Sequence, residues 1–145
     1  MDLEYEKVLL GFELEVHLPY RDDRYGLGAE FEPSEETPWR VRKTVAEELS
    51  EALGVEVKAP YRLRKVSNDW AVLPENDIDH LDIDDSFGVV EVVSPPLPLQ
   101  EALRYLVKVF EYCTYMEMFT SILSGLHLNM SLPRWGNKFH SVHKE

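Results

Sequence analysis

An alternating pattern of apolar and polar residues near the N-terminus predicts the first strand. Across residues 9–17, apolar side chains share one face and polar ones the other, namely Glu13, Glu15 and His17. The apolar face is expected to pack against a core. Two carboxylates one pleat apart have two interpretations: they lie on the solvated face of an antiparallel sheet, or they share a divalent cation that offsets their repulsion.

A second strand is predicted over residues 88–96, in the sequence Gly-Val-Val-Glu-Val-Val-Ser-Pro-Pro. Valines fall on both faces, which is typical of a strand covered on both sides. Glu91 in that setting must be paired with a base, protonated or bound to metal, because an unpaired buried carboxylate is costly. A metal ligand and an ion pair with a buried arginine remain the alternatives.

A third period-two segment spans residues 122–132. Its apolar face holds Leu126, Leu128 and Met130, whereas its polar face holds His127, Asn129 and Ser131. Ser124 and Gly125 precede it and permit a close approach of backbone or ligand.

Two segments have helical spacing. Thr37 and Pro38 begin the first as N-cap and first-turn residue, and Gly54 ends it; its buried stripe is Val41, Val45, Leu49, Ala52 and Leu53. The second helix is predicted from Leu99 to about Met118. Its apolar stripe is Leu99, Leu103, Leu106, Val107, Phe110 and Cys113.

The remaining segments are shorter. Residues 55–57, 61–66 and 69–73 predict short strands, residues 19–38 a long mobile loop, and residues 133–145 a loose tail. The acidic run at residues 77–85 lacks the glycine and glutamate of a calcium loop, so it is interpreted as an exposed loop or strand edge. The alternative is that one aspartate of the run joins the metal site. The order of elements favours one α+β domain over residues 1–145, with a largely antiparallel sheet and helices on one face.

Composition narrows the classes of function. The 145 residues carry a formal net charge of -12, which opposes general binding to nucleic acid or to anionic membranes. No segment approaches the ~20 apolar residues of a membrane span, and the acidic N-terminus is unlike a signal peptide. A single cysteine, Cys113, forms no internal disulfide, and its helical apolar setting indicates core packing. We therefore expect a cytoplasmic protein.

The predicted strands at residues 9–17, 88–96 and 122–132 each carry a carboxylate or a histidine. If these strands are neighbours with their polar faces aligned, Glu13, Glu15, Glu91 and His127 lie together. Such a set suits magnesium bridging the phosphates of a nucleotide.

Three blocks also carry a family resemblance. Gly11-Phe12-Glu13-Leu14-Glu15, Val90-Glu91-Val92-Val93-Ser94-Pro95-Pro96-Leu97 and Ser124-Gly125-Leu126-His127-Leu128-Asn129 resemble, in order, the signature blocks of the amidoligase family, relatives of glutamine synthetase and glutamate–cysteine ligase. Trp70 and the acidic run match an intervening aromatic and acidic block. The resemblance implies a glutamine synthetase-like catalytic fold, shortened at its C-terminus.

The resemblance also implies an activity and a set of site residues. The activity is ATP- and Mg-dependent ligation of a small-molecule or peptide carboxylate to an amine through an acyl phosphate. The implied metal ligands are Glu13, Glu15, Glu91 and His127. Glu91, His127 and Arg64 are the expected catalytic residues, and the expected nucleotide contacts are His127, Asn129, Arg62 and Ser94.

Two departures from the family pattern leave alternatives open. Asn129 stands where the family has a second histidine, and few basic residues follow the last strand to bind phosphate. Arg40, Arg62 or Arg64 replaces the missing arginine, a second subunit or another chain completes the site, or the short form is inactive. For the basic group at residues 62–65, a solvated strand face is the other interpretation.

Two further functions compete with a ligase. A noncatalytic acidic module, such as an inhibitor or a nucleic-acid mimic, agrees with the net charge and with the acidic run. A metal-dependent hydrolase ranks last, because no second histidine or aspartate lies at tight spacing.

Overall fold

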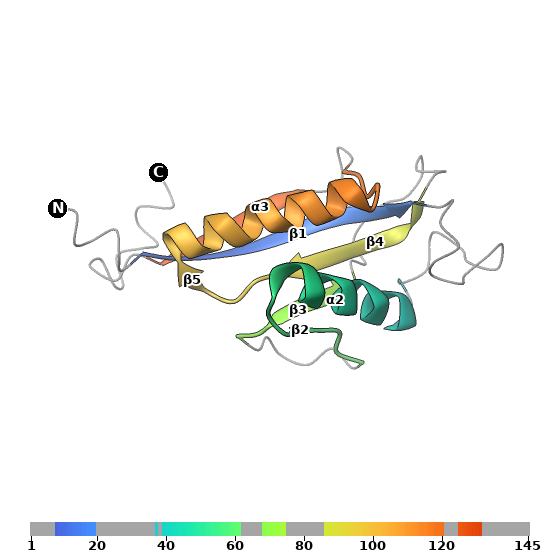
Figure 1. The fold of residues 1–145 in the computed structure, drawn as a ribbon, viewed down its shortest axis with the longest axis horizontal. Coiled ribbons are helices and arrows are strands. Elements are labelled where there is room, and N and C mark those ends of the chain that lie inside the picture. The colour runs from blue at the N-terminus through green and yellow to red at the C-terminus, as the bar shows by residue number, and fades with distance from the viewer. Residues whose placement is uncertain are drawn as a thin grey trace.

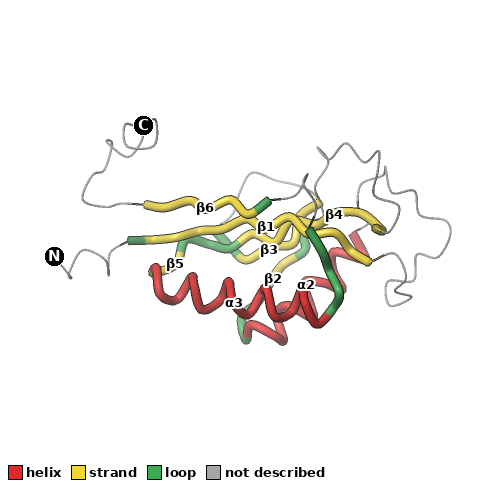
Figure 2. Tube along the Cα trace, turned by 90° about the horizontal axis from the view of Figure 1, so that it is seen from above, coloured by secondary structure: helices red, strands yellow, loops and turns green. Residues whose placement is uncertain are grey.

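The structure is a computed structural model that describes residues 8–19, 37, 39–61, 68–74, 86–120 and 125–131. Within them, a mostly antiparallel sheet carries two helices on one face, so the coarse α+β prediction is confirmed (Figures 1 and 2). The strands are β1 (Leu9–Pro19), β2 (Val57–Lys58), β3 (Trp70–Pro74), β4 (Ser86–Val93), β5 (Leu97–Pro98) and β6 (Leu126–Ser131). The helices are α2 (Trp39–Leu53) and α3 (Leu99–Tyr115).

Strand β1 lies inside the sheet and has neighbours along both of its edges. It pairs antiparallel with β4 through Glu13–Pro19 and with β5 through Leu9 and Leu10. It also pairs antiparallel with β6 from Leu9 to Leu14. Leu9, Leu10, Glu13 and Leu14 therefore have partners on two sides, which places β6 across β1 from β4 and β5. On the far side, β4 pairs antiparallel with β3, which pairs parallel with β2.

The apolar face of β1 meets both helices, as the alternation predicted. Phe12, Leu14, Val16 and Leu18 are buried in one cluster with the inner residues of α2 and α3. Figure 2 shows both helices below the sheet, with α3 running along β1. Trp70 links the layers, because its ring makes edge contacts with Phe12 and with Tyr105 of α3.

Helix α2 begins and ends near the predicted positions, and two polar residues at its start are buried. Gly54 follows the last helical residue at φ 73°, a conformation that costs glycine little, and its N–H bonds to the carbonyl of Ser50. The Thr37 hydroxyl donates to the carbonyl of Val89 on β4. Arg42 donates from Nε to the Thr37 carbonyl and from Nη1 to the Pro60 carbonyl. These contacts join the start of α2 to β4 and to the chain after β2, and the sequence pattern did not predict them.

Four details of the predicted elements are wrong. In the predicted buried stripe of α2, Ala52 is exposed and Ala46 is buried instead. The strand at residues 55–57 is instead the two-residue β2. Glu91 is only partly buried, because the helices cover the other face of β4. In the apolar stripe of α3, Leu103, Val107 and Phe110 are exposed, whereas Ala102, Val109 and Tyr112 are buried.

Other predictions fall outside the described residues. They concern almost all of the loop at 19–38, most of the strand at 61–66, the acidic run at 77–85 and the tail at 133–145. Among the described helices, none is long and apolar enough to cross a membrane.

Ser94 maintains the pairing of β1 where β4 ends. Its hydroxyl accepts a hydrogen bond from the Phe12 N–H at 2.8 Å and donates to the Pro95 carbonyl at 3.0 Å. The Ser94 N–H donates to the Phe12 carbonyl at 2.9 Å. The Ser94 hydroxyl thus takes the place of the backbone carbonyl that would accept from the Phe12 N–H in a regular ladder. Pro95 and Pro96 follow and have no N–H with which to extend the pairing.

We expect Ser94→Ala to lower the free energy of unfolding by about 1–3 kcal/mol, because the buried Phe12 N–H loses its acceptor. Equilibrium unfolding in urea, followed by tryptophan fluorescence, measures the change. Ser131→Ala is the matched control, since Ser131 is exposed on β6 and its loss is expected to cost less than about 0.5 kcal/mol. Equal midpoints for both variants would show that the Ser94 hydroxyl is not needed for this pairing.

Candidate functional site

The candidate site lies on the sheet face opposite α2 and α3. In the register of the sheet, Glu15 is opposite Glu91, Glu13 is opposite His127, and Gly11 is opposite Asn129. Residues directly opposite each other in an antiparallel pair point to the same face. The polar residues of β1, β4 and β6 therefore share one face, which we call the carboxylate face: Glu13, Glu15, Glu91, His127 and Asn129.

Glu15 and Glu91 occupy the closer of the two kinds of cross-strand position. The Glu15 N–H bonds to the carbonyl of Gly125, so its backbone groups point away from β4. Glu15 and Glu91 therefore form a non-hydrogen-bonded pair, in which the Cα atoms of opposed residues are about 4.5 Å apart. Both side chains are partly buried. Two carboxylates at such positions repel each other, and a cation placed between them would relieve that repulsion.

Glu13 and His127 lie beside this pair, toward the sheet edge. Nδ1 of His127 is 3.7 Å from Oε2 of Glu13, and the side chains are 61% and 37% exposed. A contact with that exposure contributes less than about 1 kcal/mol to stability, and it is an ion pair only when the imidazole is protonated. It places Nδ1 of His127 beside Glu13 on the carboxylate face. Asn129 lies opposite Gly11, which has no side chain to contact it.

His17 continues the polar side of β1 but is enclosed. Its side chain is 1% exposed, and its ring stacks on Phe119 with centroids 5.0 Å apart and an interplanar angle of 11°. Backbone hydrogen bonds in both directions join the same two residues. Phe119 thus covers His17, and the accessible part of the carboxylate face begins at Glu15.

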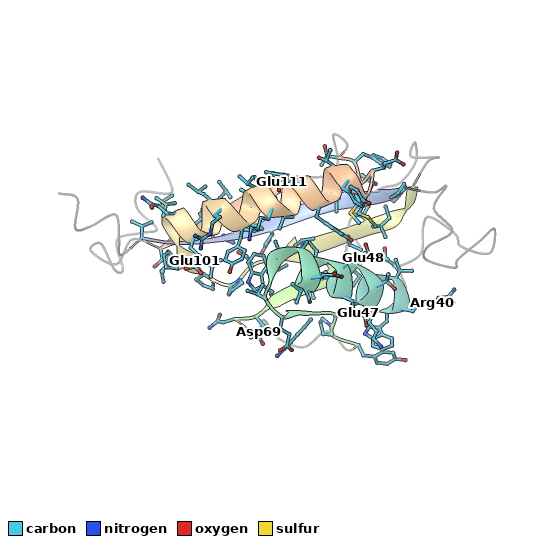
Figure 3. All side chains as sticks on the ribbon, in the orientation of Figure 1. Arg40, Glu47, Glu48, Asp69, Glu101 and Glu111 are labelled. Atoms are coloured by element: carbon cyan, nitrogen blue, oxygen red, sulfur yellow. The ribbon has the colours of Figure 1, made fainter. Side chains whose placement is uncertain are left out.

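Two other sequence-predicted site residues, Ser94 and Arg40, do not lie on the carboxylate face. Ser94 is buried, and both functions of its hydroxyl are used within the strand pairing, so we leave it out of the candidate site. Arg40 is on α2, which covers the opposite face of the sheet (Figure 3). Arg62 and Arg64 fall outside the described residues.

The predicted metal ligands Glu13, Glu15, Glu91 and His127 are all described, and within the described ranges no group of three or more His, Cys, Asp or Glu side chains is arranged to hold a metal ion. A magnesium site needs only one or two carboxylates, because water and substrate phosphate fill its other positions. Glu15 and Glu91 provide two carboxylates, and Glu13 and His127 are the next donors along β1 and β6.

Comparison of the chain with protein-family models, with curated proteins and with solved structures found no match.

Cys113, the single cysteine of the sequence, lies in the core on α3. It is a free, buried thiol, and burial raises its pKa to about 12. The nucleophilic form is the thiolate, so this thiol is unreactive in the folded protein. The sequence-based interpretation of Cys113 as a core residue is consistent with this placement.

We expect Ellman's reagent at about pH 8 to label native Cys113 only as fast as the protein opens, because the buried group stays protonated. The protein unfolded in guanidinium chloride is the control and should react at once. Fast labelling under native conditions, at a rate proportional to reagent concentration and to the ordinary thiolate fraction, would contradict the burial of this thiol.

Proposed function

We propose that the protein is an ATP- and Mg-dependent carboxylate–amine ligase whose nucleotide and metal site is on the carboxylate face. The observation that carries the proposal is the register that puts Glu15 opposite Glu91 and Glu13 opposite His127. These are the residues for which the amidoligase resemblance implies metal binding. The register supports the proposal because strands far apart in the sequence bring those residues to one surface.

The reaction of such a ligase has two transfers. An oxygen of the substrate carboxylate bonds to the γ-phosphorus of ATP, and the bond to ADP breaks. A neutral amine then bonds to the carbonyl carbon of the acyl phosphate, and inorganic phosphate leaves as the amide forms and a proton is released. Both transfers pass negative charge through phosphoryl oxygens, so the site must neutralise that charge.

The residues of the carboxylate face have separate roles in this proposal. Glu15 and Glu91 supply the anionic oxygens for magnesium, which when bound neutralises charge on the ATP phosphates. Glu13 lies beside His127. The imidazole of His127 would donate a hydrogen bond to phosphate and, when protonated, would place a positive charge next to it. Asn129 offers neutral donors and acceptors to the nucleotide. Arg62 and Arg64 are our candidates for the phosphate-binding arginine.

The test of binding is thermal unfolding with Mg²⁺ alone, and with Mg²⁺ and a nonhydrolysable ATP analogue. At about 100 times the dissociation constant, a ligand that binds only the folded state adds about 2.7 kcal/mol, which raises Tm by several degrees. We expect that rise for the wild type with both ligands, and its loss in Glu15→Gln and Glu91→Gln. Glu51→Gln is the matched control, because Glu51 is exposed on α2, which covers the other face.

The test of chemistry uses hydroxylamine, which converts acyl phosphates into hydroxamates. Incubation with ATP, Mg²⁺, hydroxylamine and a set of amino-acid and peptide carboxylates should give a hydroxamate and an equal amount of ADP, both of which depend on Glu91. Nucleotide binding without hydroxamate would support the site but not the ligase. Absence of any rise in Tm would remove both and favour the noncatalytic acidic module.

A further inference from the structure

Large apolar side chains are exposed on α3 and on β6, on the helix side of the sheet. Six of them are 38–54% exposed, and we call these six the α3–β6 surface: Leu103, Val107, Phe110, Leu126, Leu128 and Met130. In Figure 1, β6 runs behind α3, and in Figure 2 it forms an edge of the sheet beside β1. Large contiguous apolar patches are uncommon on soluble monomers and mark interaction sites.

The α3 residues and the β6 residues of this surface point toward the same region beside the sheet. Tyr105 and Tyr112 of α3 face the α2 side, through Trp70 and through a 3.1 Å hydrogen bond to Glu48. Helical spacing puts Leu103, Val107 and Phe110 on the other flank of α3, toward β6. The β6 residues lie opposite Leu10, Phe12 and Leu14, and so they point to the helix side. The α3 flank and β6 thus form the two walls of a step.

Strand β6 also has an open backbone edge within the described part of the chain, where it pairs with β1 alone. Because the Glu15 N–H bonds to the Gly125 carbonyl, the odd-numbered residues of β6 direct their backbone groups toward β1. The N–H and C=O groups of Leu126, Leu128 and Met130 therefore point outward. Among the described residues, the β6 positions with exposed apolar side chains are therefore the ones whose backbone groups have no ladder partner.

We propose that a second copy of this chain covers the α3–β6 surface, with β6 pairing antiparallel to the partner's β6 and α3 lying antiparallel to the partner's α3. One two-fold axis through the middle of β6 satisfies both contacts. Val107 is the central residue of α3 (Leu99–Tyr115). The chain before α3 pairs with Leu9 and the chain after it pairs with His17, so Val107 lies close to the level of Phe12, whose partner is Leu128.

Backbone parity agrees with the same axis. Hydrogen bonding between the two β6 strands requires even-numbered residues to face even-numbered residues. An axis at Leu128 meets that condition, because it pairs Leu128 with the partner's Leu128 and Leu126 with the partner's Met130. Two copies of the sheet then join into one, as in other isologous interfaces.

The two copies of α3 lie close enough for their apolar side chains to meet. Glu111 is exposed on the solvent side of α3 (Figure 3), whereas the Arg104 guanidinium lies 5.8 Å from the centroid of the Tyr105 ring, toward the α2 side. With α3 over β1, three strand spacings separate the helices by about 14 Å, which Leu103, Phe110 and Met130 from both copies fill.

The dimer would extend the carboxylate face as well. His127 and Asn129 flank Leu128 on the polar side of β6. A two-fold axis at Leu128 places His127 opposite the partner's Asn129, and Asn129 opposite the partner's His127. The polar faces of the two subunits therefore join at the axis. This inference does not depend on the proposed function, because the apolar contacts lie on the other side of the sheet.

The oligomeric state of the full chain tests the proposal by sedimentation velocity over about a hundredfold range of concentration, at about 0.15 M salt. We expect a dimer for the wild type, and at least tenfold weaker association for Val107→Glu and for Leu128→Glu. Both residues are more than half exposed in one subunit, so circular dichroism of the variants should stay native-like. A wild type that stays monomeric at the highest concentration would overturn the proposal and indicate that another segment of the chain covers the surface.

Lys108→Glu is the matched control for these two variants. Lys108 lies over the Tyr105 ring, which faces the α2 side, so its substitution should leave association unchanged. A dimer that is insensitive to Val107→Glu and Leu128→Glu would use a different surface and would also overturn the proposal.

Discussion

The arrangement of the molecule depends on the pairing of β1 along both of its edges. Because side chains alternate along a strand, the register of that pairing decides which residues share a face. A slip of one residue between β1 and β4 would turn Glu91 toward the helices and Val90 and Val92 away from them. The apolar core and the carboxylate face are therefore two results of one register. Burying a carboxylate under α2 and α3 would be unfavourable, so the observed register is preferred over the slipped one.

Several contacts fix this register at the ends of β1. At one end, the Ser94 hydroxyl accepts from Phe12 where two prolines interrupt the ladder. At the other end, His17 is joined to Phe119 by two backbone hydrogen bonds and by ring stacking. Thr37 ties the start of α2 to β4. The side chains of Ser94, His17 and Thr37 are buried, and each residue contacts a partner from a distant part of the sequence. These contacts are specific to one alignment of the strands, whereas apolar contacts tolerate several.

The sequence predicts best what depends on short periods. The strands β1 and β6 and the turn at Gly54 follow from spacing alone, and the structure confirms them. The register with β1 also confirms which residues of β6 share a face, although all six residues of β6 are exposed. The roles of Ser94 and Thr37 were beyond prediction because they depend on which strand lies beside each residue. The predicted buried stripe of α3 was partly wrong, because apolar residues extend around more of the helix than the sheet and α2 cover. Periodicity identified the apolar residues, but it did not predict which side of the helix would be covered.

The two open surfaces of β6 have different chemistry. Its polar side, with His127 and Asn129, adds to the carboxylate face, whereas its apolar side, with Leu126, Leu128 and Met130, adds to the α3–β6 surface. An edge strand with both faces exposed lowers the stability of the folded protein, because its backbone groups and its apolar side chains both remain in contact with water. Coverage of the apolar side by a second copy would remove that cost and leave the polar side accessible.

The most direct test of the shared carboxylate face is paramagnetic broadening by Mn²⁺, which binds carboxylate oxygens as Mg²⁺ does. In an amide NMR spectrum of the labelled protein, substoichiometric Mn²⁺ should first broaden the signals of Glu13, Glu15, Glu91 and His127. The signals of α2 and α3 should persist, and excess Mg²⁺ should reverse the effect. Broadening spread evenly over the acidic residues of the chain, or broadening that spares Glu15 and Glu91, would contradict a cation site on this face.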